Sequence, residues 1–166
     1  MQPTYPELDP DALRRAMRRW ATGVTIVTTC HAGTQHGMTV SSFTSVSLDP
    51  PLALVTLQHT ARTYALVKAA RVFGVSILGR QHIEISDRFA GRVPEDGDRF
   101  AGVETFTLKS DAPLLVGCLA AFDCRVVETY VSGTNTLFIG QVEAVYVGPE
   151  QQPPLLYYDR EYRTLI

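Results

Sequence analysis

The sequence predicts a mainly β protein, an antiparallel β-barrel with a few short helices. About six segments are rich in β-branched and aromatic residues and are separated by turns that contain Gly or Pro, which is the pattern of consecutive antiparallel strands. Three helix-like segments lie among them without the regular strand–helix alternation of a parallel sheet. The length of 166 residues is that of one domain, and we expect a single domain over residues 1–166.

The first predicted element is a helix that begins at Asp9 and ends near Gly23. Asp9 is a suitable N-cap, and Pro10 suits the first helical position. Gly23 is the expected terminator. Arginines line most of the helix, which indicates a solvated surface. Apolar residues recur at helical spacing on one face: Leu13, Met17 and Trp20.

Strands and two further helices account for most of the remaining chain. Asp49-Pro50-Pro51 marks a sharp break, because proline cannot donate a ladder hydrogen bond. Residues 31–37 are rich in turn formers, residues 91–113 predict a long polar excursion, and residues 131–135 have the composition of a hairpin turn. The predicted strands are 24–29, Met38–Leu48, 52–57 (with both faces buried), 71–78, Leu114–Tyr130 and Thr136–Val147, with one more short strand in the tail. The predicted helices are Ala61–Ala70 and Gln81–Ala90.

Composition and charge argue against several functional classes. The formal net charge of −2 gives no reason to expect a nucleic acid or an anionic membrane as partner. No apolar run is long enough to span a bilayer, and the N-terminus does not have the pattern of a signal peptide. The four histidines lack metal-binding spacing, so we expect no metal site. Three cysteines without a CxxC motif predict reduced thiols and a cytoplasmic protein.

The most unusual segment is Thr39–Ser47, in which six of nine residues carry hydroxyl groups. A solvated surface strand can contain such residues without any function. Here the segment precedes a proline break and an apolar strand, which would place hydroxyl and main-chain N–H groups at the mouth of a barrel. Such groups suit a heterocycle with alternating hydrogen-bond donors and acceptors, for example a flavin. On the pattern alone, both interpretations stay open.

Four segments of the chain carry a shared signature. The most distinctive runs from Gly37 to Leu52 and has the sequence GMTVSSFTSVSLDPPL. Three more follow in order: RVFGVSIL with a glutamine beyond it, DRFAGV leading to APLL, and CRVV. Together these segments resemble the flavin reductase-like family of FMN-binding split barrels. The resemblance covers nearly the whole chain and implies an antiparallel split β-barrel.

The resemblance also implies an NAD(P)H-dependent flavin reductase that binds FMN or FAD and supplies reduced flavin to a partner monooxygenase. Arg62 and Thr63, at a helix start, have the chemistry of an anion site. Arg88 could equally form an ion pair with Glu84 or Asp87. The residues implied to bind the cofactor are Thr39, Val40, Ser41, Ser42, Phe43, Ser45, Gln58, Arg62, Thr63, Arg88 and Phe89.

The hydride donor, NADH or NADPH, is implied to stack against the flavin, since the chain has no GxGxxG motif that would bind it on a Rossmann unit. Ser42 and Asn135 are the candidate catalytic residues. Asn135 stands where many relatives have a histidine; an amide can hydrogen-bond but cannot transfer a proton near neutral pH. Four residues of the tail could cover the nicotinamide side: Tyr157, Tyr158, Arg160 and Arg163.

The family likeness further implies a homodimer with the flavin near the subunit interface. Two other functions fit the same residues: a flavin-binding electron-transfer module, and an oxidase or oxygenase that retains its FMN. Turnover that rises with added free flavin would separate the reductase from both.

Overall fold

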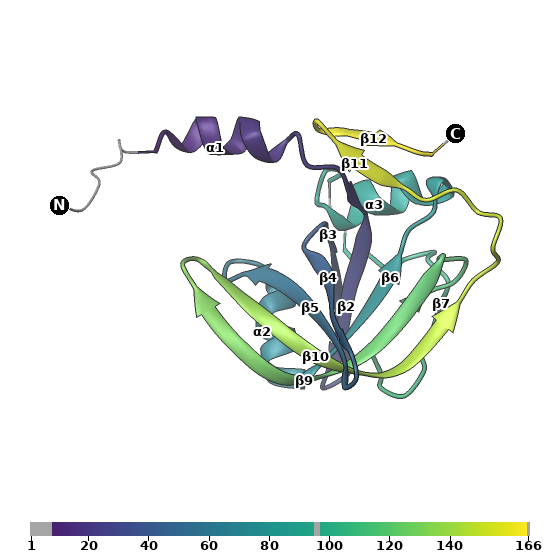
Figure 1. Cartoon of the computed structure of the whole chain (residues 1–166). Coiled ribbons are helices and arrows are strands. Elements are labelled where there is room, and N and C mark those ends of the chain that lie inside the picture. The colour runs from purple at the N-terminus through teal and green to yellow at the C-terminus, as the bar shows by residue number, and fades with distance from the viewer. Residues whose placement is uncertain (1–7, 95–96, 166) are drawn as a thin grey trace.

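The main feature of the computed structural model, which describes residues 8–94 and 97–165, is a seven-stranded antiparallel sheet. Its strands are β2 (Thr25–His31), β3 (Thr34–Val40), β4 (Phe43–Leu48), β5 (Pro51–Gln58), β6 (Val72–Ile77), β9 (Ala120–Ser132) and β10 (Asn135–Val147). The strand order is β3-β2-β6-β9-β10-β5-β4. The edge strands β3 and β4 are joined by only Ser41 and Ser42, so the two edges meet and the sheet rolls up (Figure 1). The predicted antiparallel barrel is confirmed.

Smaller elements decorate the barrel (Figure 1). A three-stranded sheet joins the two ends of the chain: β1 (Thr22–Gly23), β11 (Leu156–Tyr158) and β12 (Glu161–Arg163). The segment before the long hairpin of β9 and β10 contributes a two-stranded antiparallel sheet, β7 (Thr105–Phe106) and β8 (Leu114–Leu115). The helices are α1 (Pro10–Met17), α2 (Arg62–Ala70), the 3-10 turn η1 (Arg80–His82) and α3 (Ile83–Phe89).

The core fills the barrel from one face of each strand. On β5 the buried residues Ala53, Val55 and Leu57 alternate with half-buried neighbours, as expected for an antiparallel strand with one face inward. The expectation that this strand is buried on both faces is therefore wrong. Helix α2 lies across β2 and inserts Val67, which is fully buried in the same core as Phe73.

Several predicted strand boundaries need correction. The segment Met38–Leu48 is two strands rather than one, because the chain leaves the ladder at Ser41 and Ser42. Residues 34–37, expected to be a turn, belong to β3, and the turn is confined to Ala32 and Gly33. The segment Leu114–Tyr130 is likewise divided. The tail forms a hairpin of two strands instead of a single strand.

Helix α1 begins as predicted, with the Asp9 carboxylate accepting a hydrogen bond from the main-chain N–H of Asp11. It ends at Met17, well before Gly23, and Trp20 lies outside it. The apolar stripe does not pack on the barrel: Leu13, Met17 and Trp20 are 50%, 60% and 69% exposed. Over residues 8–94 and 97–165, no helix is long and apolar enough to cross a membrane.

Candidate active site

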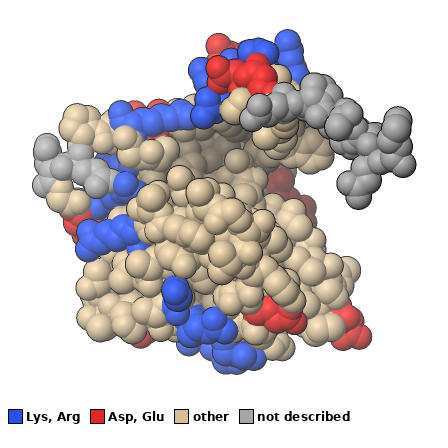
Figure 2. Space-filling model, turned by 90° about the vertical axis from the view of Figure 1, so that its left-hand side faces the viewer, with Lys and Arg blue, Asp and Glu red and all other residues tan. Residues whose placement is uncertain are grey.

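A cleft of about 910 Å³ lies between α1 and the point where β3 passes into β4. Figure 2 shows the surface hollowed beneath the charged residues at the top of the molecule. One wall is the link from Ser41 to Thr44, continued by Leu54 of β5. The opposite wall combines residues of α1 and of the segment after it with β11 and the turn between β11 and β12: Arg14, Met17, Arg18, Trp20, Tyr157, Asp159 and Arg160.

A side-chain hydrogen bond ties the hydroxyl-rich link to β5. Ser41 and Ser42 lie between two ladders, so their main-chain groups are turned away from regular strand pairing. The Ser42 hydroxyl donates to the Thr56 carbonyl of β5 at 2.9 Å. Phe43 packs against Phe122 with ring centroids 5.4 Å apart. The predicted residues Ser41, Ser42 and Phe43 therefore come together at the cleft.

Thr39 and Val40 line a smaller pocket of about 150 Å³ that shares Ser41 and Tyr157 with the cleft. The Thr39 hydroxyl donates to the Ser86 carbonyl of α3 at 2.6 Å. Since this hydroxyl already donates its proton, it can offer a ligand only acceptor lone pairs. Ser45 is exposed on β4, opposite Ala53.

A second group of predicted residues gathers at the far end of β5. Gln58 pairs directly across the ladder with Asn135, the first residue of β10. Arg62 is exposed and begins α2. Thr56, the partner of Ser42, precedes Gln58 by two residues, which is about 7 Å along a strand. Strand β5 thus connects this second group to the cleft.

Two histidines hold the second group in place. Thr63 is buried, and its hydroxyl lies 2.8 Å from Nδ1 of His36, which lies on β3 rather than in the turn expected over residues 31–37. His59 Nε2 lies 2.9 Å from the Thr136 hydroxyl of β10. The Thr63 hydroxyl is therefore engaged with the protein, whereas the Arg62 side chain is exposed.

Arg88 and Phe89 lie on α3 and face different surroundings. Arg88 donates to the Ala101 carbonyl at 2.8 Å, in place of the ion pair considered with Glu84 or Asp87. The Phe89 ring is 1% exposed and packs edge-on against Phe100 at 5.0 Å. The main-chain carbonyl of Phe89 accepts a hydrogen bond from Arg99 at 3.0 Å, so the whole residue is engaged with the protein.

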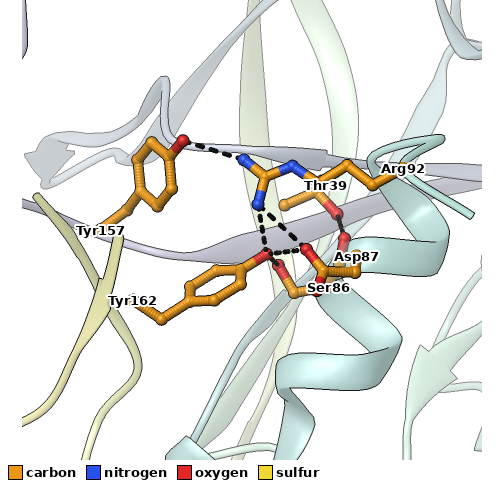
Figure 3. A network of polar contacts seen from close by, with 6 residues as sticks. All are labelled: Thr39, Ser86, Asp87, Arg92, Tyr157 and Tyr162. Carbon is orange, nitrogen blue, oxygen red and sulfur yellow. Dashed lines mark hydrogen bonds and ion pairs between the residues drawn. The ribbon is translucent and has the colours of Figure 1, made fainter. Parts of the chain in front are cut away.

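A polar network that the sequence did not predict connects α3 and the residues just after it to the C-terminal hairpin of β11 and β12 (Figure 3). Its centre is Arg92, which contacts Asp87 at 3.0 Å and the Tyr157 hydroxyl at 2.8 Å. Tyr162 joins the same network from β12. Tyr157 and Tyr162 are 65 to 75 positions from Arg92 and Asp87 in the chain, so no local pattern signals that the tyrosines join this network.

The charge at the cleft is mostly positive. Arg14 is paired with Asp11 at 2.8 Å, whereas Arg18 and Arg160 have no ion-pair partner among residues 8–94 and 97–165. Arg160 and the preceding Asp159 both have positive φ, 68° and 49°. These are the two central residues of the tight turn between β11 and β12, in which positive φ at both positions matches the twist of the paired strands.

The described residues contain no cluster of three or more His, Cys, Asp or Glu side chains that could hold a metal ion. Cys30, Cys118 and Cys124 are free thiols. Burial raises the pKa of the Cys124 thiol to about 12, with Asp123 and Glu143 adding to the shift. The Cys124 thiol is therefore protonated and unreactive near neutral pH.

Known proteins resemble this chain in both sequence and structure. Residues 17–165 match the model of the flavin reductase like domain. The chain is 38% identical to an NADH-dependent flavin reductase from Rhodococcus sp., over 99% of this chain and 94% of the relative. The solved NADH:FAD oxidoreductase SgcE6 of Streptomyces globisporus, in complex with NAD and FAD fragments, has a TM-score of 0.87 at 31% identity and covers 98% of both chains. The styrene monooxygenase flavin reductase of Pseudomonas putida S12 has a TM-score of 0.80 at 36% identity, over 93% of this chain and 97% of that one. This chain therefore belongs to the flavin reductase like domain family.

Proposed function

We propose that this chain is an NAD(P)H:flavin oxidoreductase that reduces FMN or FAD and passes the reduced flavin to a partner oxygenase. The observation that carries the proposal is the cleft, in which a wall of hydroxyl and main-chain groups faces a wall of arginines and aromatic rings. When bound there, flavin supplies the redox chemistry by accepting a hydride at N5 from C4 of the nicotinamide. The protein has to bind, orient and shield the two rings.

The link Ser41–Phe43 is the proposed flavin wall. Its main-chain N–H groups can donate to the acceptor atoms of the heterocycle, and the Ser42 hydroxyl can accept, because its own proton is given to Thr56. Thr39, Val40 and Ser45 extend this wall along β3 and β4. A preorganised donor at the edge of the ring favours the negative charge that reduction creates.

The second group at the end of β5 is the proposed site of the flavin tail. Arg62 supplies an exposed guanidinium at the first position of α2, a nine-residue helix whose N-cap Ala61 gives no side-chain hydrogen bond. A phosphate there would meet both the guanidinium and the N–H groups of the first turn. Gln58 and Asn135 lie side by side between this position and the cleft, where their amides can hydrogen-bond to hydroxyls of the tail.

The opposite wall is the proposed place of the nicotinamide nucleotide. Arg18 and Arg160 offer two guanidinium groups suited to its phosphates. Trp20 and Tyr157 present rings to the same cleft, and aromatic rings can stack on nicotinamide or adenine.

We also propose a homodimer and a reducing, cytoplasmic setting. Apolar side chains are exposed on α1 and on the outer faces of several strands, with Leu48 90% and Val131 74% exposed. In Figure 2 a broad face of the barrel carries few charges. Large uncharged surface of this kind favours self-association. The free thiols fit a reducing compartment.

Steady-state oxidation of NADH in the presence of free FMN tests the proposed function. The rate should rise with FMN concentration and saturate. Arg18→Gln and Arg160→Gln should each raise KM for NADH about fivefold, because each removes one charged contact to phosphate. Arg15→Gln is the matched control: Arg15 lies on α1, three residues before Arg18, forms an ion pair with Asp9 and is outside the cleft lining. The absence of any turnover with NADH or NADPH would reject the proposal.

A further inference from the structure

The hairpin of β11 and β12 depends on contacts from outside itself. Each strand has three residues, and the pairing with β1 adds only two more. A two-stranded hairpin of this size is marginal in water. Main-chain hydrogen bonds anchor the hairpin and the residue before it to Val24, Leu78 and Arg18. Side chains that reach the hairpin from the rest of the fold then orient its tyrosine rings.

Arg92 makes the densest set of these contacts (Figure 3). One terminal nitrogen lies 2.8 Å from the Tyr157 hydroxyl, and the other lies 3.4 Å from the Tyr162 hydroxyl and 3.0 Å from Asp87 Oδ1. The guanidinium carbon also lies 5.4 Å and 5.5 Å from the centres of the two tyrosine rings. The rings meet edge to face at 5.7 Å.

Arg92 is itself fixed in place. Its main-chain N–H donates to the Asp87 carbonyl at 3.0 Å, and Gly91, which ends this turn, has a φ of 69°. The Tyr162 hydroxyl continues the network to Ser86 Oγ at 2.9 Å. Ser86 is fully buried, and its carbonyl accepts the hydroxyl of Thr39 on β3.

The network thus fixes Tyr157 relative to the strand that leads into the flavin wall. Tyr157 lines both the large cleft and the adjoining small pocket, and Arg92 lines only the small pocket behind it. A planar guanidinium can bridge a carboxylate and two phenols at once, whereas a lysine ammonium offers a single charged point on a flexible stem.

We propose that Arg92 is a positioning residue for the nicotinamide nucleotide, because it holds Tyr157 in place as the wall against which the nucleotide binds. This inference rests on the proposed reductase function. Arg92 does not touch the reacting atoms; it acts through Tyr157 and the hairpin. Its loss should weaken nucleotide binding while leaving the flavin wall, which is carried by β3, β4 and β5, intact.

The test compares Arg92→Gln, Arg92→Lys and Tyr157→Phe with the wild-type protein. KM for NADH should rise about tenfold in both Arg92 variants, which corresponds to ~1.4 kcal/mol, with kcat changed less than about twofold. FMN affinity, measured by flavin fluorescence, should stay within about twofold of wild type. Tyr157→Phe keeps the ring and removes only the contacting hydroxyl. The double variant Arg92→Gln/Tyr157→Phe should be no worse than Arg92→Gln alone, because both changes break the same contact.

Arg19→Gln is the matched control. Arg19 makes the same kind of contact with the neighbouring tyrosine, 3.5 Å from the Tyr158 hydroxyl, and neither residue belongs to the cleft lining. It should leave KM for NADH unchanged.

Three results would overturn the inference: unchanged KM in the Arg92 variants, parallel losses of kcat and FMN affinity, or additive effects in the double variant. If Arg92→Gln fails to fold, the test rests on Tyr157→Phe. Its KM for NADH should then be raised, and an unchanged KM for NADH would contradict the inference. Wild-type protein that oxidises neither nucleotide would instead reject the proposed function, so the two failures are distinguishable.

Discussion

A single methyl group added at Gly140 should destabilise the barrel without touching the cleft. Gly140 lies on β10, where a Cβ would sit 2.6 Å and 2.7 Å from two ring atoms of Phe73 and 2.8 Å from Cys124 Cβ. Phe73 and Cys124 are both fully buried, so neither can move aside without disturbing the core. Overpacking of this kind costs about 1–3 kcal/mol. Alanine also lowers the conformational entropy of the unfolded chain relative to glycine, which offsets at most about 0.4–1 kcal/mol of this cost.

Urea unfolding of Gly140→Ala measures this effect. We expect the free energy of unfolding to fall by about 1–2 kcal/mol with an unchanged m value. Gly23→Ala is the control, because a Cβ there has no heavy atom within 4 Å, and its stability should equal or exceed that of the wild type. If Gly140→Ala were as stable as Gly23→Ala, the close packing of β10 on Phe73 would be refuted.

Three further predictions concern buried groups. Burial lowers the pKa of His82. Below about pH 6.5 the unfolded chain therefore takes up a proton that the folded protein does not. The unfolding free energy of the wild type should decrease as the pH is lowered through this range, and His82→Gln should lack this contribution. Parallel stability curves for the two proteins would contradict this. Cys124, with its pKa of about 12 and no exposure, should resist alkylation in the folded protein, while half-buried Cys30 reacts first in peptide mapping. Asp123→Ala should lower the free energy of unfolding by about 3 kcal/mol, because the buried carboxylate accepts hydrogen bonds from two main-chain N–H groups and one hydroxyl of residues 109–110. A decrease under about 1 kcal/mol in thermal or urea unfolding would show that this loop does not depend on the carboxylate.

The antiparallel barrel was predictable because strand composition and turn formers are local signals. The turn of the long hairpin at Gly133 and Thr134, the strand ends on either side of it and the α2 segment were located to within a residue or two, whereas β9 begins six residues after the predicted start at Leu114. The division of Met38–Leu48 into two strands was not predictable, because Ser41 and Ser42 are compatible with a strand. They leave the ladder only because the two edges of the sheet must meet there.

The candidate site was partly predictable for the same reason. The hydroxyl-rich segment is contiguous, and it does line the cleft through Ser41, Ser42 and Phe43. The roles of the other predicted residues, including Arg62 and Asn135, stay predictions. The Arg92 network could not be anticipated, because α3 and the C-terminal hairpin meet only in the folded chain. The exposure of α1 could not be predicted either, because an amphipathic pattern predicts an apolar face but not whether that face packs on the rest of the protein.

The central claim is that this chain reduces flavin with a nicotinamide nucleotide in the cleft beneath α1. Anaerobic rapid mixing of the protein and FMN with NADH, followed by loss of the absorbance of oxidised flavin, tests it most directly. We predict reduction whose observed rate saturates with NADH concentration and whose half-saturation shifts upward in Arg160→Gln. Flavin that stays oxidised with both NADH and NADPH would contradict the claim.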